Sequence, residues 1–229
     1  MLSQTTISPA VRHMPGISAG RLPLRDCHLL SGSIEMIGAP MSFCRNEEIF
    51  GEGEPADYLY KVISGTVRTY KVLADGRRQI QAFYLPGDIF GLDTGDDHTV
   101  SAEAVSDTKI LVIKRSAVVA LAQRDGDVAR RLWDLTAREL HRVQEHVLLL
   151  IKTAQERVVG FLLEMAERVH AGREIELPMS RQDIADYLGL TIETVSRTLT
   201  QLATTAAIEL PSSRRIVLRN RAALSRLNA

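Results

Sequence analysis

The chain has 229 residues, of which 45% are hydrophobic, so it can bury one large core or two smaller ones, and we expect two domains. Its 28 lysine and arginine residues balance its 28 aspartate and glutamate residues, so net charge alone does not indicate a nucleic-acid partner. No segment reaches the roughly 18 consecutive apolar residues of a membrane-spanning helix, and the N-terminus lacks the pattern of a signal peptide, which predicts a cytoplasmic protein without a membrane partner. Two cysteines, Cys27 and Cys44, are too few for a disulfide scaffold.

The first half of the chain has the pattern of an all-β domain. Residues 1–22 show no hydrophobic periodicity, and we expect a flexible N-terminal arm there. From about residue 35 to 114, short apolar runs such as Ile80–Leu85 alternate with turn signals such as Pro86–Asp88, at intervals of about ten residues. This punctuation predicts a β-sandwich or β-barrel in a domain that spans residues 23–125.

A long amphipathic helix is predicted from residue 126 to about 152. Apolar residues recur there at a mean spacing of about 3.7, separated by arginine and glutamate residues. Such a helix either packs against its own β domain, or pairs with a copy of itself and joins the two domains, and we favour the second interpretation. The predicted dimer interface consists of Leu132, Leu135, Leu140, Val143, Val147 and Leu150.

A helix-turn-helix is the strongest signal in the sequence, within a C-terminal domain that spans residues 153–229. Ser180 is followed three residues later by Asp183, which is a capping-box-like helix start. Ala185 allows two helices to approach closely, Gly189 suits the tight turn, and Val195 fills the space between the helices. All three constrained positions of a helix-turn-helix are therefore filled, which an ordinary helical hairpin does not require.

The second helix, capped by Thr191 and running to about Ala203, carries side chains suited to reading base pairs. Glu193, Ser196 and Arg197 lie on one face near its start. Arginine can donate two hydrogen bonds to guanine, glutamate can accept from cytosine, and serine can do either. The alternative is a surface ion pair between Glu193 and Arg197, worth only about 0.3–0.5 kcal/mol, and both interpretations can hold in the free protein.

A hairpin over residues 208–218 is predicted to form a wing with Arg214 and Arg215 at its tip. From Arg197 to the end there are six basic residues and one acidic residue, whereas residues 1–154 hold 18 basic and 19 acidic residues. Positive charge is thus concentrated near the predicted DNA-binding surface. The predicted phosphate contacts are Ser180, Thr191, Thr194, Thr198, Arg214 and Arg215.

At these residues the chain resembles the CRP/FNR family of bacterial regulators, and Thr191–Arg197 looks most like the FixK branch. The resemblance implies an α+β fold with an N-terminal β-roll like that of cyclic-nucleotide-binding domains, a dimerisation helix and a C-terminal winged helix-turn-helix. It implies a homodimeric regulator, most often an activator, that binds palindromes with TTGA-type half-sites and controls low-oxygen respiration or nitrogen fixation. Members that bind TGTGA carry an arginine just before the glutamate, where Ile192 stands here.

The sequence departs from the ligand-binding members of the family. The cyclic-AMP-binding members hold the phosphate with an arginine-serine pair, whereas this chain has His98-Thr99 and several acids in the same segment. Iron-sulfur members need four cysteines, and this chain has two. An isolated histidine such as His98 or His28 is more often structural than a haem ligand. Ala206 also replaces the glycine that ends the second helix in relatives. We therefore expect no metal or other cofactor.

Two other classes of function were weighed against a ligand-independent regulator. In one, the β domain senses a ligand or the redox state, with Cys44 as the reactive thiol, and DNA binding is conditional. In the other, the β domain is a cupin-like enzyme, but such enzymes cluster histidines for a metal and the six histidines here are scattered, so we expect no enzymatic activity. The resemblance adds RNA polymerase as a partner, touched by residues 74–78, although these residues also fit a simple hairpin turn.

Overall fold

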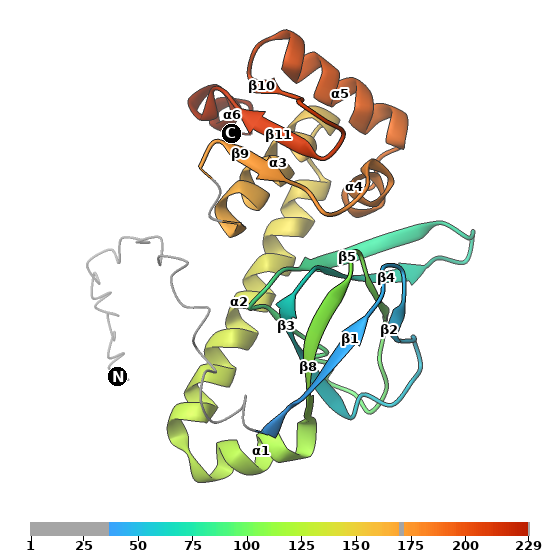
Figure 1. Cartoon of the computed structure of the whole chain (residues 1–229), viewed down its shortest axis with the longest axis vertical. Helices are drawn as coiled ribbons and strands as arrows, with labels where there is room; N and C mark the ends of the chain where they lie inside the picture. The colour runs from blue at the N-terminus through green and yellow to red at the C-terminus, as the bar shows by residue number, and fades with distance from the viewer. Residues whose placement is uncertain (1–36, 170–171, 229) are drawn as a thin grey trace, which may run out of the picture.

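The computed structural model describes residues 37–169 and 172–228, so the predicted arm, Cys27 and His28 lie outside it. Figure 1 shows a β domain and a smaller helical domain joined by one long helix. The mixed α+β architecture predicted from the sequence is confirmed. None of the helices in the described parts of the chain is long and apolar enough to cross a membrane.

The β domain is built from two four-stranded antiparallel sheets that face each other. One sheet has the strand order β1-β8-β3-β6 and the other has the order β2-β7-β4-β5. Their inward-facing residues form an apolar core in which the rings of Phe50, Tyr60 and Phe90 pack together. The strands are β1 (Ala39–Phe43), β2 (Glu48–Phe50), β3 (Tyr58–Ser64), β4 (Val67–Val72), β5 (Arg78–Tyr84), β6 (Ile89–Phe90), β7 (Ser101–Ala104) and β8 (Thr108–Lys114).

Glycines close the turns between these strands, as the sequence predicted. Gly65, between β3 and β4, has a φ of 84°, and a Cβ atom there would lie 2.4 Å from Oγ1 of Thr108. Both the backbone angle and the close approach therefore require glycine. At Gly76 in the β4–β5 hairpin only the backbone angle favours glycine, because φ is 82° and a Cβ atom there would have no neighbour within 4 Å. The tip of this hairpin extends sideways past the sheet, while β5 runs beneath the helical domain (Figure 1).

Two helices follow the last strand, α1 (Arg115–Arg124) and α2 (Gly126–Leu150). The predicted long helix is thus present and ends two residues before the expected position, with Asp125 as its N-cap. Leu132 and Leu135 do not lie on a free face of α2, because they pack against the core of the β domain around Ile113 and Val118. Their place in the dimer interface stays a prediction, and it could involve only the surface that this packing leaves exposed.

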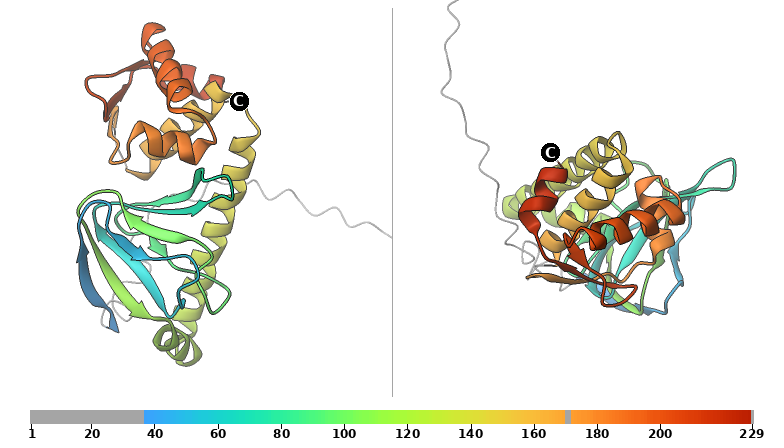
Figure 2. Two further views of the ribbon diagram at one scale, coloured as in Figure 1. Left: turned by 90° about the vertical axis from the view of Figure 1, so that its right-hand side faces the viewer. Right: turned by 90° about the horizontal axis from the view of Figure 1, so that it is seen from above.

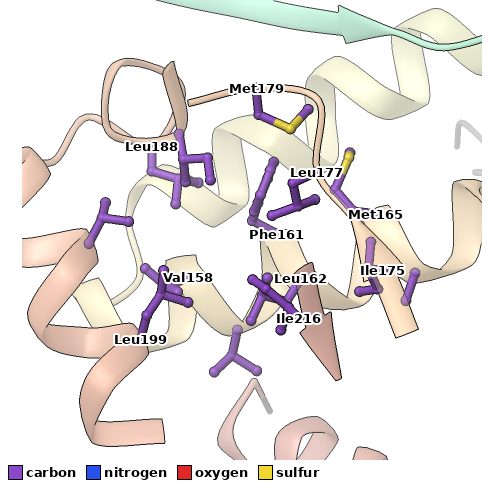
Figure 3. Packing of buried hydrophobic residues seen from close by; sticks show 14 of the residues in the cluster. Val158, Phe161, Leu162, Met165, Ile175, Leu177, Met179, Leu188, Leu199 and Ile216 are labelled. Atoms are coloured by element: carbon purple, nitrogen blue, oxygen red, sulfur yellow. The ribbon is translucent and has the colours of Figure 1, made fainter. Parts of the chain in front are cut away.

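In its described residues the helical domain contains four helices and a three-stranded antiparallel sheet. Its core is formed by the buried face of α3, the helix pair α4–α5 and residues of the sheet, with Phe161, Leu162 and Leu199 among the buried side chains (Figure 3). A capping box between Thr153 and Glu156 starts α3. The elements are α3 (Ala154–Arg168), β9 (Glu174–Glu176), α4 (Arg181–Leu188), α5 (Ile192–Thr204), β10 (Ile208–Glu209), β11 (Arg215–Leu218) and α6 (Arg221–Leu227), and the sheet order is β10-β11-β9.

The helical domain is docked on the β domain and is not held by α2 alone. Ile80 and Phe83 of β5 belong to the same buried cluster as the core of the helical domain. The ring of Phe83 lies 5.3 Å from that of Tyr187 in α4, and the ring of His146 in α2 stacks on Tyr187 at 4.1 Å. Figures 1 and 2 show α4 directly above the β4–β5 edge. The position of α4 is therefore fixed by contacts with both α2 and β5.

Candidate DNA-binding interface

Helices α4 and α5 form the predicted helix-turn-helix. The hydroxyl of Ser180 accepts a hydrogen bond from the Asp183 amide (3.1 Å), while the Asp183 carboxylate accepts one from the Ser180 amide (2.9 Å). This reciprocal cap satisfies two backbone groups at the start of α4. The helix ends at Gly189, whose φ of 61° and ψ of 39° are left-handed. The sharp turn into α5 therefore depends on the residue without a side chain.

The packing between the two helices confirms the roles predicted for the remaining constrained positions. Ala185 and Val195 are fully buried at the contact between α4 and α5, and Leu188, Leu199 and Leu202 are buried around them. Small and branched side chains at the contact let the two backbones approach closely. The angle between α4 and α5 is thus set by a rigid core.

The opposite face of α5 carries the predicted base-reading side chains. Glu193 and Arg197 are exposed and Ser196 is half-buried, all within the first two turns. A hydrogen bond to the Glu193 backbone amide, the Thr191 hydroxyl and the positive charge of Arg197 lower the pKa of the Glu193 carboxyl group. Glu193 is therefore an acceptor at neutral pH, next to an arginine donor. In Figure 1 this helix lies on the side of α4 that is farthest from the β domain.

Only some of the predicted phosphate contacts have available hydroxyl groups. Thr191 caps α5 by accepting from the Thr194 amide (3.2 Å), and the two hydroxyl groups lie 3.1 Å apart at the exposed start of the helix. Thr198 is only 7% exposed, and its hydroxyl donates to the Thr194 carbonyl oxygen at 2.8 Å. The predicted phosphate contact of Thr198 is therefore wrong, because this residue lies on the buried side of α5. The Ser180 hydroxyl is used in the cap of α4, and its phosphate contact stays a prediction.

The wing is present, but its two arginines differ. Strands β10 and β11 form the predicted hairpin, and Arg214 lies in the turn just before β11. Arg215 is already in the strand, and its guanidinium group is paired with the carboxylate of Glu174 in β9. Sequence reasoning missed β9, although Ile175 between Glu174 and Glu176 shows the alternation of a strand. At the wing tip, Arg215 therefore has a carboxylate partner on β9 and Arg214 does not.

Entry into the wing depends on an unusual backbone conformation at Ala206. Its φ is +55°, which is left-handed, and it directly follows the C-cap of α5. The Ala207 amide then donates to the Leu202 carbonyl oxygen at 3.1 Å, which closes the helix end. The replacement of glycine noted in the sequence does not prevent this turn, but an alanine side chain is disfavoured in it.

The side of α2 turned away from the β domain is apolar and exposed. Trp133, Leu140 and Val147 recur every seven residues and are 75%, 58% and 56% exposed, with Val143 and Ile151 beside them. A seven-residue repeat keeps one stripe of a helix facing a partner helix. Figure 2 shows the β-sheets on one side of α2, and no described element covers this stripe. Trp133 was missed as a member of the stripe, although its spacing to Leu140 and Val147 marks it.

The loop between β6 and β7, where a cyclic nucleotide would be held in related domains, does not fit a phosphodiester. The Asp93 carboxylate lies 2.8 Å from Nδ1 of His98 and accepts hydrogen bonds from the amide and hydroxyl of Thr99. The Arg115 guanidinium group donates to backbone carbonyl groups of the same loop, including that of Asp93. The buried His98 ring stacks on Phe50 at 3.6 Å. The cation near the loop is therefore bound to the backbone, and the anion next to it would repel a phosphate.

Sequence comparisons agree with both halves of this architecture. The Crp-like helix-turn-helix domain matches residues 156–227, and the cyclic nucleotide-binding domain matches residues 40–125. The nitrogen fixation regulation protein FixK of Azorhizobium caulinodans is 54% identical over 202 residues, which cover 86% of this chain and 82% of that protein. The transcriptional activator protein Anr of Pseudomonas aeruginosa is 35% identical over 171 residues, which cover 72% of this chain and 69% of that protein.

A solved structure shares the fold over most of its length. The structure of FixK2 from Bradyrhizobium japonicum has a TM-score of 0.81 and 52% sequence identity, and it covers 84% of this chain and 98% of that one. Related chains over this span are transcriptional regulators and not enzymes. Together with the capped helix pair, these matches place the chain in the CRP/FNR family of transcriptional regulators, as a FixK-like member with a helix-turn-helix DNA-binding domain.

Proposed function

We propose that this regulator is a homodimeric activator that binds palindromic DNA sites with TTGA-type half-sites. The observation that carries the proposal is the exposed face of α5, where Glu193, Ser196 and Arg197 stand in the first two turns of a capped helix. The N-terminal residues of such a helix reach base edges in the major groove. An arginine fork reads guanine and a carboxylate reads the cytosine amino group, which matches the G·C pair in a TTGA half-site.

The apolar stripe on α2 supports a two-fold dimer. Trp133, Leu140 and Val147 are too exposed and too apolar for a stable monomer surface, and a second α2 would cover them. A symmetric dimer presents two reading helices to two half-sites about one helical turn apart, roughly 34–36 Å. Palindromic sites follow from this symmetry.

The relatives support a role in anaerobic or nitrogen-fixation gene control. The relatives include proteins named for nitrogen fixation regulation and a protein named as a transcriptional activator. The loop at Asp93 and His98 is held together by its own hydrogen bonds, so we propose that DNA binding needs no small molecule. The exposed turn of the β4–β5 hairpin around Arg77 is available to RNA polymerase, whereas Arg78 is paired with carboxylates of α4.

The test is a DNA-binding titration with the purified full chain, without added ligand and with both chelator and reductant present. Fluorescence anisotropy would compare a TTGA palindrome, a TGTGA palindrome and a random duplex at one fixed salt concentration. We expect the TTGA duplex to bind at least tenfold more tightly than either of the others. Equal binding to all three, or a requirement for a cyclic nucleotide, would contradict the proposal.

A matched pair of variants identifies the reading residues. Glu193→Ala should lose discrimination chiefly at the base pair whose cytosine it contacts, while Thr200→Ala, an exposed position one turn beyond Ser196, should keep it. A selection of bound sites from a random DNA pool gives the preferred base at each position for both variants. An unchanged consensus for Glu193→Ala would remove this residue from the reading face.

A further inference from the structure

Buried and partly buried ion pairs attach helix α4 to the β domain, and the proposed base-reading residues take no part in them. On the side of the β domain, Arg68 lies in β4 and Arg78 is the first residue of β5. The Asp183 carboxylate accepts hydrogen bonds from Arg68 (3.0 Å) and from Arg78 (2.6 Å), and Arg78 also donates to Asp186 at 2.9 Å. Asp183 is only 4% exposed and Arg68 only 6%. Arg68 also donates to Glu103 of β7 at 2.7 Å, so a network of charged side chains from both domains extends from the first turn of α4 to Asp186.

The two oxygen atoms of Asp183 have separate tasks. Oδ2 accepts from the amide and hydroxyl of Ser180 and completes the cap of α4, while Oδ1 accepts from both guanidinium groups. Burial by itself would raise the pKa of Asp183, but the Ser180 hydrogen bonds and the charges of Arg68 and Arg78 outweigh it and hold that pKa below its usual value. Asp183 is therefore charged in the folded protein and connects the helix cap directly to the β domain.

The other end of α4 is held by the same strand. The side chain of Gln79 in β5 donates to the carbonyl oxygen of Tyr187 at 3.2 Å. The Tyr187 ring packs on Phe83 of β5, on Phe161 of α3 and on His146 of α2. Contacts at both ends of α4 fix its direction relative to β5, which contacts at one end would not do.

We expect a displacement of α4 to move α5 with it, because the contact between the two helices is closely packed. Ala185 and Val195 are fully buried between the helices, and the turn between them passes through the left-handed Gly189. The path from the β domain to the reading face therefore runs through β5, α4 and α5, with α4 in the middle (Figure 1). Between α4 and α5 this path crosses only the turn from Gly189 to Thr191.

We propose that Arg68 and Arg78 are positioning residues for DNA recognition, which fix through Asp183 and Asp186 the distance between the two reading helices of the dimer. The proposal rests on the proposed dimeric DNA-binding function. A rigid dimer matches one half-site spacing, because the second half-site is bound at high effective concentration only when the geometry fits. Once α4 is released, each reading helix would sample several positions, so the favoured spacing would bind more weakly and other spacings would lose less.

The experiment measures spacing selectivity and not affinity alone. TTGA palindromes with the preferred spacing, and with one or two base pairs added or removed, would be titrated against the full-length dimer at one salt concentration. The variants are Arg78→Ala and Asp186→Asn, which leave the Ser180–Asp183 cap in place. The matched control is Arg77→Ala, which removes an arginine whose recorded ion pair is with its neighbour Asp75 and not with α4.

The wild type and Arg77→Ala should share a sharp optimum in spacing. Arg78→Ala and Asp186→Asn should bind the optimal site at least about fivefold more weakly and the altered sites less than twofold more weakly, so the selectivity ratio falls. Asp186→Asn is informative because it removes a negative charge, which by general electrostatics should strengthen DNA binding.

Two results would overturn the proposal. One is a spacing profile identical to the wild type in both variants while circular dichroism and thermal unfolding show an intact fold. The other is a loss by the same factor at every spacing in Arg78→Ala with none in Asp186→Asn, since this would make Arg78 a simple phosphate contact. A wild type without preference for any TTGA palindrome would instead refute the proposed function, so the two failures are distinguishable.

Discussion

The most informative perturbation is Leu140→Glu, in the middle of the exposed stripe on α2. Leu140 is 58% exposed in the single chain, so a partner helix would cover roughly half of its surface. Full burial of a leucine contributes about 1.5–3 kcal/mol, so this half is worth about 1 kcal/mol in each protomer. The glutamates would also bring two like charges together near the two-fold axis. We expect the total to be about 3 kcal/mol, which weakens dimerisation on the order of 100-fold.

The chain supplies its own reporter for this experiment. Its single tryptophan, Trp133, lies one heptad before Leu140 on the same stripe and is 75% exposed. Sedimentation velocity would give the oligomeric state, and dilution of the wild type should shift tryptophan emission to longer wavelength as the dimer dissociates. Leu140→Glu should show the exposed emission at every concentration. It should also bind a full palindrome with an affinity close to that for one half-site.

Two control variants separate dimerisation from folding. Arg138→Glu changes an exposed residue that lies on the other side of α2, because two residues correspond to about 200° of helix rotation, and it should leave the dimer intact. Leu132→Glu should instead lower the unfolding temperature, since Leu132 packs on the core of the β domain. If Leu140→Glu sediments as a dimer at the same concentrations as the wild type, the interface lies elsewhere on the molecule.

Further predictions concern the helix end, the two classes of DNA contact and pH. Ala206→Gly should stabilise the chain by about 1 kcal/mol because φ is +55° there, and calorimetry should show a Tm higher by roughly 2–4 °C. The control Ala120→Gly, in the middle of α1, should destabilise the chain. A lower Tm for Ala206→Gly would contradict this reasoning. Arg197→Ala should weaken the free energy of binding by about 1–3 kcal/mol on the cognate site and by little on random DNA, as measured by anisotropy titrations. An equal loss on both DNAs would make Arg197 a phosphate contact. Arg214→Ala should weaken binding to all sequences and lower the slope of log K against log salt by about one, and an unchanged slope would exclude the contact. Burial lowers the pKa of His146, so the neutral ring stabilises the native state above the ordinary histidine pKa of about 6.5, and this stabilisation is lost as pH falls from there toward the folded pKa. His146→Phe should reduce the change in the free energy of unfolding, measured with urea, over this pH range. An unchanged pH dependence would exclude His146 as its source.

The helix-turn-helix could be predicted in detail because its signals are local. Ser180 and Asp183 lie within one turn of each other, and Gly189 defines a backbone angle at its own position. The proposed reading face of α5 follows from the helical period alone, which places Glu193 and Arg197 together. Each of these features depends on neighbours within a few residues, so the sequence determines them before any long-range contact forms.

The partner of an apolar face is not a local property. Hydrophobic periodicity identified α2 as amphipathic, but it did not separate two apolar faces of the helix. Leu132 lies on the face that packs against the β domain, and Leu140 lies on the exposed face. For the same reason Thr198 was assigned to DNA, whereas the packing of α5 against the rest of the domain buries it. A repeat near 3.6 residues shows that a stripe will be covered, and only the tertiary structure shows by what.

The ion pairs that orient α4 lie beyond any sequence pattern. Arg78 and Asp183 are 105 residues apart, and Arg68 and Asp183 are 115 apart. In the sequence Arg78 fits an exposed hairpin turn and Asp183 fits a helix cap, and both interpretations are correct as far as they go. Their meeting requires the β4–β5 hairpin to reach the helical domain, which depends on the folding of both domains. The sequence therefore determined the helix-turn-helix, and the tertiary structure decided how its first helix is held, because a charge is paired by proximity in space and not by position in the chain.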